Sequence, residues 1–211
     1  MNSADPRHYL WWLVSRASGL VALGLVTLAV LLGLLMATRS IGRPALRRSV
    51  MRLHEHVAIA GLIAIALHGF ALLGDRWLHP GLVGIAIPFE LSYRSLYTGV
   101  GIIAGYLTAL LALSYYMRKR IGPRRWRQAH RATVVAWALA VVHTLGAGSD
   151  GGTIWLRAGV FATAAPISYL FLVRLIARAP RAALPAAEAE KVVALGSRIE
   201  GASAAASARS R

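Results

Sequence analysis

The sequence predicts an all-α membrane protein, a bundle of about five transmembrane helices. Three observations lead to this prediction: 57% of the 211 residues are hydrophobic, the mean hydropathy is +0.56, and the apolar residues gather in runs long enough to cross a bilayer. One soluble core could not bury that much apolar surface. A helix crosses the hydrocarbon with about 20 apolar residues. We therefore expect a multi-pass protein of the cell membrane, in contact with the lipid bilayer.

Five stretches are candidates for the spans. The fourth is the least apolar at its start, where polar and aromatic side chains crowd together, so we expect that start at the membrane interface. The stretches are 10–37, 53–73, 96–117, 128–147 and 154–177.

The arginines of the connections predict the orientation. The connections after the first, third and fifth stretches are rich in arginine, and those after the second and fourth are not. By the positive-inside rule, the N-terminal segment 1–9 lies outside and the C-terminus inside. The formal net charge of +16 could also suit a nucleic acid, but no nucleic-acid motif accompanies it, so we expect no such partner.

Two further segments are not expected to cross the membrane. The segment 80–92 is apolar but short and broken by Pro80 and Pro88, so we expect it to lie along the outer surface, where it could roof a cofactor. The tail 178–211 is rich in Ala, Ser, Arg and Glu, and we expect it to be disordered, with a short helix around 186–195.

There is no cysteine, and no G-x-G-x-x-G motif indicates a fused flavin or nicotinamide domain.

Four histidines stand out in the second and fourth stretches: His54, His68, His130 and His143. A histidine is costly in a lipid-spanning helix unless something binds it, and imidazole is a common axial ligand of heme iron. Both helices begin on the basic side and therefore run parallel, with their two histidines roughly 21 Å apart. The set predicts two heme sites, His54 with His130 near the inner face and His68 with His143 near the outer face.

The helical angles fit this interpretation only in part. His68 returns to within roughly 40° of His54, and Gly61 lies midway on the same stripe, where a flat macrocycle could press against the helix. His143 lies roughly 140° from His130 on an ideal helix. The fourth helix must therefore overwind locally, or the two cofactors must face different directions. Periodicity alone does not pair these two histidines.

Three other residues have two interpretations each. His56 lies about 200° from His54, which favours an interfacial role, and it is the substitute ligand if His54 does not bind. Arg16 either extends to the interface or pairs with a propionate of the outer heme. Arg131 could do the same at the inner heme, although it also belongs to the cluster that sets the orientation. Gly101 and Gly105 predict helix packing.

The histidine spacing resembles that of the ferric reductase-like transmembrane domain family. The pattern is His-x13-His in one helix and Trp-x3-His-x12-His two helices later, here His54/His68 and Trp126/His130/His143. The stretches W-L-V-S-R-A-S-G-L, L-H-E-H, W-R-Q-A-H-R and H-T-L-G-A-G-S-D look like those of bacterial single-domain members, which are related to the heme-binding membrane subunit of the methionine sulfoxide reductase system. The resemblance covers roughly residues 11–172.

The resemblance implies b-type heme between the second and fourth helices, with His54 opposite His130 and His68 opposite His143, and electron transfer across the membrane. We expect a cytochrome b that is a component of an oxidoreductase. It would take electrons from a separate cytoplasmic flavoprotein or a quinol and pass them to an extracytoplasmic acceptor such as ferric iron, oxygen or a redox protein.

Two alternatives remain open. The chain could be the quinol-oxidising heme subunit of a periplasmic reductase. It could also be a heme-free transporter or structural membrane protein whose histidines relay protons or bind a divalent cation. Against the second alternative, the spans lack carboxylates, since Glu55, at a helix start, is the only acid near one.

Overall fold

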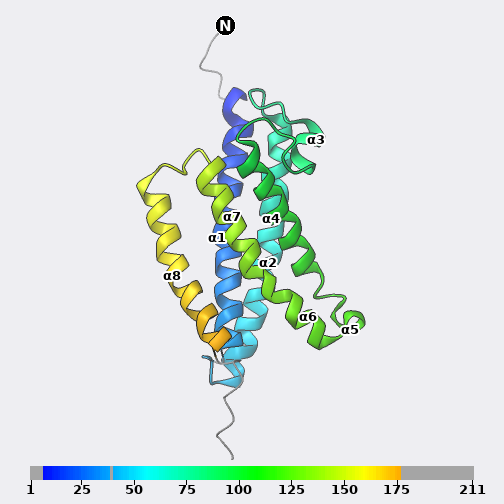
Figure 1. The fold of residues 1–211 in the computed structure, drawn as a ribbon, viewed down its shortest axis with the longest axis vertical. Helices are drawn as coiled ribbons and strands as arrows, with labels where there is room; N and C mark the ends of the chain where they lie inside the picture. Colours follow the sequence, from blue (N-terminus) through cyan, green and yellow to red (C-terminus); the bar gives the residue numbers. More distant parts are fainter. Residues whose placement is uncertain (1–6, 39, 177–211) are drawn as a thin grey trace, which may run out of the picture. The chain divides into compact units, whose positions relative to one another are not determined.

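The computed structural model describes residues 7–38 and 40–176 (Figure 1). These residues form helices, turns and loops without a strand. Contacts divide the chain into two units, Met1–Arg174 and Leu175–Arg211, and the helices belong to the first apart from the last two residues of α8. The predicted disordered tail 178–211 and its helix at 186–195 lie outside the described residues. The helices are α1 (Arg7–Ala37), α2 (Pro44–Ala71), η1 (Leu72–Gly74), α3 (Gly81–Ala86), α4 (Ser95–Leu113), α5 (Arg118–Ile121), α6 (Pro123–Ala129), η2 (His130–Ala132), α7 (Thr133–Ala147) and α8 (Ile154–Ile176).

Four helical segments are long and apolar enough to cross a membrane: Tyr9–Ala37, Pro44–Gly74, Ser95–Leu113 and Ile154–Ile176. Large apolar side chains on them are exposed, among them Ile63 at 64%, Leu110 at 67% and Phe161 at 71%. Such exposure suits contact with lipid rather than water. The prediction of a multi-pass membrane protein is confirmed at this level.

The fourth predicted stretch, 128–147, is built differently from the others. It comprises the end of α6, the 3₁₀ turn η2 and the 15-residue helix α7. Alone, α7 is shorter than the roughly 20 residues that a span needs. A fifth span and the orientation of the chain therefore stay predictions.

Helix α2 begins earlier than the sequence predicted, at Pro44 instead of residue 53. Proline is favoured in the first helical turn, and arginine is a good helix former, so Arg47, Arg48 and Arg52 continue the helix beyond the apolar run. Apolarity marks where a helix can meet hydrocarbon, and the helix itself can extend further. The segment 80–92 forms only the six-residue helix α3, which is too short to cross the membrane, as predicted.

The helices pack in two pairs, α1 along α2 and α4 along α7, and α1–α7 and α2–α4 contacts join the pairs (Figure 1). Buried side chains of α1, α7 and α8 form the core; they are Val26, Val30, Leu34, Trp137 and Ile167. The indole Nε1 of Trp137 donates to Thr27 Oγ1 at 2.9 Å. This packing fixes the helices that carry the histidines and their hydrogen-bond partners.

Candidate functional site

The four histidines meet in two pairs across the bundle. The ring centroids of His54 and His130 lie 6.4 Å apart, with an angle of 79° between the rings. Those of His68 and His143 lie 6.1 Å apart, at 74°. We call the first the inner pair and the second the outer pair, following the orientation that the arginines predict. The partners are those expected from their depths along the helices.

Each of the four rings has its Nδ1 at a backbone carbonyl of a neighbouring helix. Helix α1 supplies the acceptors for the two rings of α2, and α4 supplies those for the other two. The Nδ1–O distances are 2.9 Å for His54 to Ala29, 2.8 Å for His68 to Ser15, 3.3 Å for His130 to Leu111 and 2.8 Å for His143 to Tyr97. A carbonyl only accepts, so Nδ1 carries the proton and Nε2 keeps its lone pair. Metal-binding histidines are oriented in this way.

The separation of the rings suits a single metal ion between the members of each pair. Imidazole nitrogen binds a metal at about 2.0 Å. Two such bonds in line, with a ring radius of roughly 1.2 Å on each side, put the ring centroids roughly 6.4 Å apart. The observed separations are 6.4 Å for the inner pair and 6.1 Å for the outer pair. Imidazole is also a common ligand of heme iron, so each pair could supply two such ligands.

Glycines make room for three of the four rings. Each stands four residues, or about one turn, after the carbonyl that accepts from the ring. A Cβ at Gly19 would lie 2.9 Å from the His68 ring, one at Gly33 would lie 3.4 Å from His54, and one at Gly101 would overlap His143. The helices can present their carbonyls to the imidazoles because no side chain stands in the way.

His130 is held by a different set of contacts. Its acceptor, the Leu111 carbonyl, lies in the last turn of α4 and also accepts from Ser114 Oγ at 2.7 Å. Trp126 stacks on the His130 ring at 4.9 Å between centroids, with 26° between the planes. The indole Nε1 of Trp126 donates to Ser114 Oγ at 3.1 Å. One hydroxyl thus links the stacking partner of His130 to its hydrogen-bond acceptor.

The 3₁₀ turn η2 accounts for much of the angular mismatch along the fourth predicted helix. His130 begins this turn, and a 3₁₀ helix advances about 120° per residue instead of about 100°. Three such residues reduce the offset between His130 and His143 from roughly 140° to roughly 80°. The local overwinding considered from the sequence is therefore present.

Arg16 pairs with Asp150, an acid that the sequence analysis did not connect with it. Its Nε and Nη2 donate to the two carboxylate oxygens at 2.6 and 2.5 Å. The guanidinium also lies over the ring of Trp12, 5.1 Å from its centroid. This bidentate ion pair connects the outer end of α1 with the turn between α7 and α8. A propionate contact for Arg16 stays a prediction.

Gly61 and His56 lie away from the histidine pairs. A Cβ at Gly61 would meet Val26 and Leu25 of α1 at 3.5 Å, so this glycine lets α1 and α2 approach closely. His56 is exposed, and its Nδ1 lies 2.8 Å from the Arg52 carbonyl of its own helix. The interfacial interpretation of His56 fits these contacts, and a macrocycle contact at Gly61 stays a prediction.

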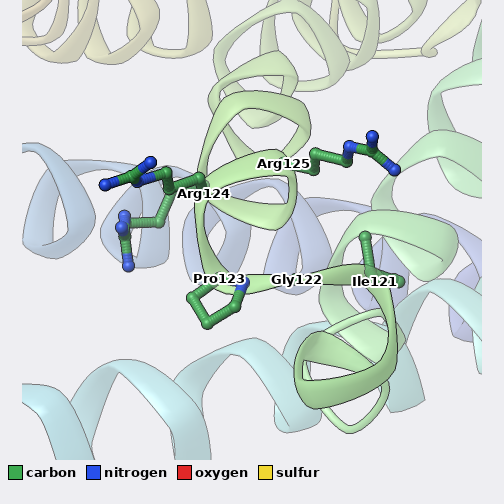
Figure 2. A pocket seen from close by; sticks show the side chains of 6 residues that line it. Ile121, Gly122, Pro123, Arg124 and Arg125 are labelled. Atoms are coloured by element: carbon green, nitrogen blue, oxygen red, sulfur yellow. The ribbon is translucent and has the colours of Figure 1, made fainter.

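The inner end also carries a basic surface at the junction of α5 and α6. A hollow of about 570 Å³ lies there, lined by Ile121, Gly122, Pro123, Arg124, Arg125 and Arg127. Figure 2 shows the side chains of Arg124 and Arg125 extending to opposite sides of α6. Helix α6 continues directly into His130, so this surface adjoins the inner pair along the chain. Arg131, the next residue, has a buried Nε without a partner among the described residues.

The sequence analysis missed the acceptor carbonyls and the glycines. One signal was present, because Gly19 and Gly33 stand 14 residues apart in the first stretch, the same separation as His54 and His68 in the second. Gly101 was interpreted as a packing residue, whereas it faces the His143 ring. A shared spacing of glycine in one helix and histidine in its neighbour indicates rings pressed against a backbone.

The likeness of this chain to known proteins depends on its histidine spacing. The family that this spacing resembles, and the heme that the resemblance implies, stay predictions. No protein-family model, curated protein or solved structure matches the chain.

Proposed function

We propose that this chain is a di-heme transmembrane electron-transfer protein of the cell membrane, similar to the ferric reductase-like family. Heme iron, when bound, supplies one-electron redox chemistry. The observation that supports the proposal best is the set of four imidazoles, opposed in pairs with the proton on Nδ1. His54 and His130 would hold the inner heme, and His68 and His143 the outer one.

The chain's own contribution is to fix the ligands. Carbonyls of α1 and α4 hold the Nδ1 protons, so each Nε2 keeps its lone pair for binding. The glycines allow the rings to lie against the helices, and Trp126 holds the one imidazole that lies outside a regular α-helix. Along α2 the two ligands are separated by roughly 21 Å, which gives one site near each face of the membrane.

The basic surface around α5 and α6 supports a donor on the inner side. Its arginines would attract an acidic flavoprotein and speed their encounter. A quinol dissolved in the bilayer remains the alternative donor. The acceptor would lie at the outer face, close to the His68–His143 pair.

Electron transfer across vesicles tests the proposal. The purified protein is placed in liposomes that contain trapped ferricyanide, and dithionite is added outside. We expect the ferricyanide to be bleached faster with the wild-type protein than in empty liposomes, and the gain to disappear in His68→Ala and His130→Ala. Equal rates for wild type and both variants would contradict the proposal. Reduction of the hemes by added quinol, compared with a flavoprotein and NADH, would identify the donor.

A further inference from the structure

Two arginines at the inner end have buried Nε–H groups without a hydrogen-bond partner. They are Arg131 in η2 and Arg174 in the last turn of α8, and no other incompletely exposed side chain in the described ranges has a buried polar atom left unpaired. A buried donor without an acceptor is unfavourable. Such groups in folded proteins usually have a protein, water or ligand acceptor.

Both arginines belong to the surroundings of the inner pair. Arg131 directly follows His130 in the 3₁₀ turn. Arg174 comes from a different helix and lies near enough for its charge to act on the His130 ring. Glu55 directly follows His54 in the chain, yet the one ion pair among the described residues is Arg16–Asp150 at the other end. Two cationic groups therefore remain unneutralised beside the inner imidazoles.

We propose that Arg131 and Arg174 bind the carboxylates of the group held by the inner pair, which in a b-type heme are its two propionates. This inference rests on the proposed function and assigns two more residues to the inner site. A guanidinium binds a carboxylate through two parallel N–H groups, one of which can be Nε–H. The buried Nε of Arg174 indicates a specific acceptor for this side chain.

Heme dimethyl ester, in which both propionates are neutral, tests this assignment in the full-length protein. The inner heme is isolated in the His68→Ala background, and binding of heme b and of the ester is compared by absorption titration. We expect heme b to bind about tenfold more tightly than the ester. Arg174→Gln and Arg131→Gln should each weaken heme b about tenfold and leave the ester nearly unchanged. Arg125→Gln, on the exposed inner surface, is the matched control.

The midpoint potential of the inner heme gives a second measurement that does not depend on activity. Loss of a nearby positive charge disfavours electron uptake, so Arg174→Gln should lower this potential, while Arg174→Lys should restore part of it. Equal loss of heme b and ester binding in Arg174→Gln would show that the arginine acts through the fold. A loss that follows the phosphatidylglycerol content of the liposomes would assign it to a lipid phosphate. Either result would overturn the proposal. If His130→Ala binds heme like wild type, the proposed function itself is wrong.

Discussion

The two histidine pairs have nearly equal ring separations, 6.4 and 6.1 Å, but their surroundings differ. In the outer pair both rings bond to carbonyls within regular α-helices at 2.8 Å, and glycines lie beneath both rings. In the inner pair one ring lies in a 3₁₀ turn, has a longer bond of 3.3 Å and is stacked on an indole. The outer pair is held mainly by backbone, with the Ser15 hydroxyl 3.1 Å from His68 Nδ1, and the inner pair is held more by side chains.

This difference suggests how each site would respond to change. Backbone carbonyls in packed helices do not move easily, so the outer site should tolerate little added volume. The inner site depends on Trp126, Ser114 and nearby arginines, so single side-chain substitutions should adjust it gradually. The two sites should therefore be separable by mutation.

The largest effect is expected from the ligands themselves. His143→Ala should remove one low-spin heme signal and leave the other, because a proposed heme site would lose a ligand only when a histidine of its own pair is replaced. His130→Ala should remove the complementary signal, and the double variant should remove both. Optical and electron paramagnetic resonance spectra of the purified proteins provide the measurement. His56→Ala is the control and should retain both signals.

The second-largest effect is expected from alanine substitutions at the glycines beside the histidine rings, which should affect the two sites to different extents. Gly101→Ala should abolish most outer heme binding, because the new Cβ would overlap the His143 ring, and Gly19→Ala should reduce it, with a Cβ 2.9 Å from His68. Gly33→Ala should be milder at the inner site, since its contact is 3.4 Å. Heme content per chain measures the series. Gly24→Ala on the same helix meets nothing within 4 Å, so a comparable loss there would contradict the explanation.

Trp126→Leu should weaken the inner site alone. An aromatic contact of this kind contributes about 0.5–1.5 kcal/mol, so inner heme binding should fall about threefold to tenfold while the outer heme stays unchanged. Heme titration in the His68→Ala background measures the effect. The exposed indole of Trp155 offers a matched control, and equal losses in Trp155→Leu and Trp126→Leu would show that the stacking is irrelevant.

The smallest effect is expected at the Arg16–Asp150 ion pair. Asp150→Asn weakens the Arg16–Asp150 ion pair between α1 and the α7–α8 turn, and it leaves the four histidines in place. We expect a lower midpoint of thermal denaturation with the heme spectra retained. Arg76→Gln, a charge change at an exposed position, serves for comparison. Loss of the outer heme in Asp150→Asn would instead make this ion pair part of the outer site.

Much of the fold follows from the sequence because lipid imposes a simple rule of length and apolarity. The stretches 10–37, 96–117 and 154–177 were located to within a few residues. The start of α2 was missed because Pro44 and the arginines form a helix without being apolar. The histidine partners follow from depth along parallel helices. The Asp150 partner of Arg16 lies 134 residues away in the chain, and no local pattern indicates such a contact.

The site was less predictable than the fold for a physical reason. Which residue is a ligand depends on its side-chain type, but its orientation depends on backbone carbonyls such as those of Ser15 and Leu111, which have no sequence signature of their own. The one sequence feature that reports this orientation is a glycine beside the ring, as at Gly19, Gly33 and Gly101. The carbonyl that accepts from His130 lies in the last turn of α4, where no glycine is needed to make room for the ring. The sequence therefore contains no glycine that would indicate this contact.

The ratio of heme to protein in the purified wild-type chain, taken with its absorption spectrum, tests the central claim most directly. The account predicts two hemes per chain, both with the low-spin spectrum of two axial imidazoles. A colourless protein that also fails to bind added heme would contradict it.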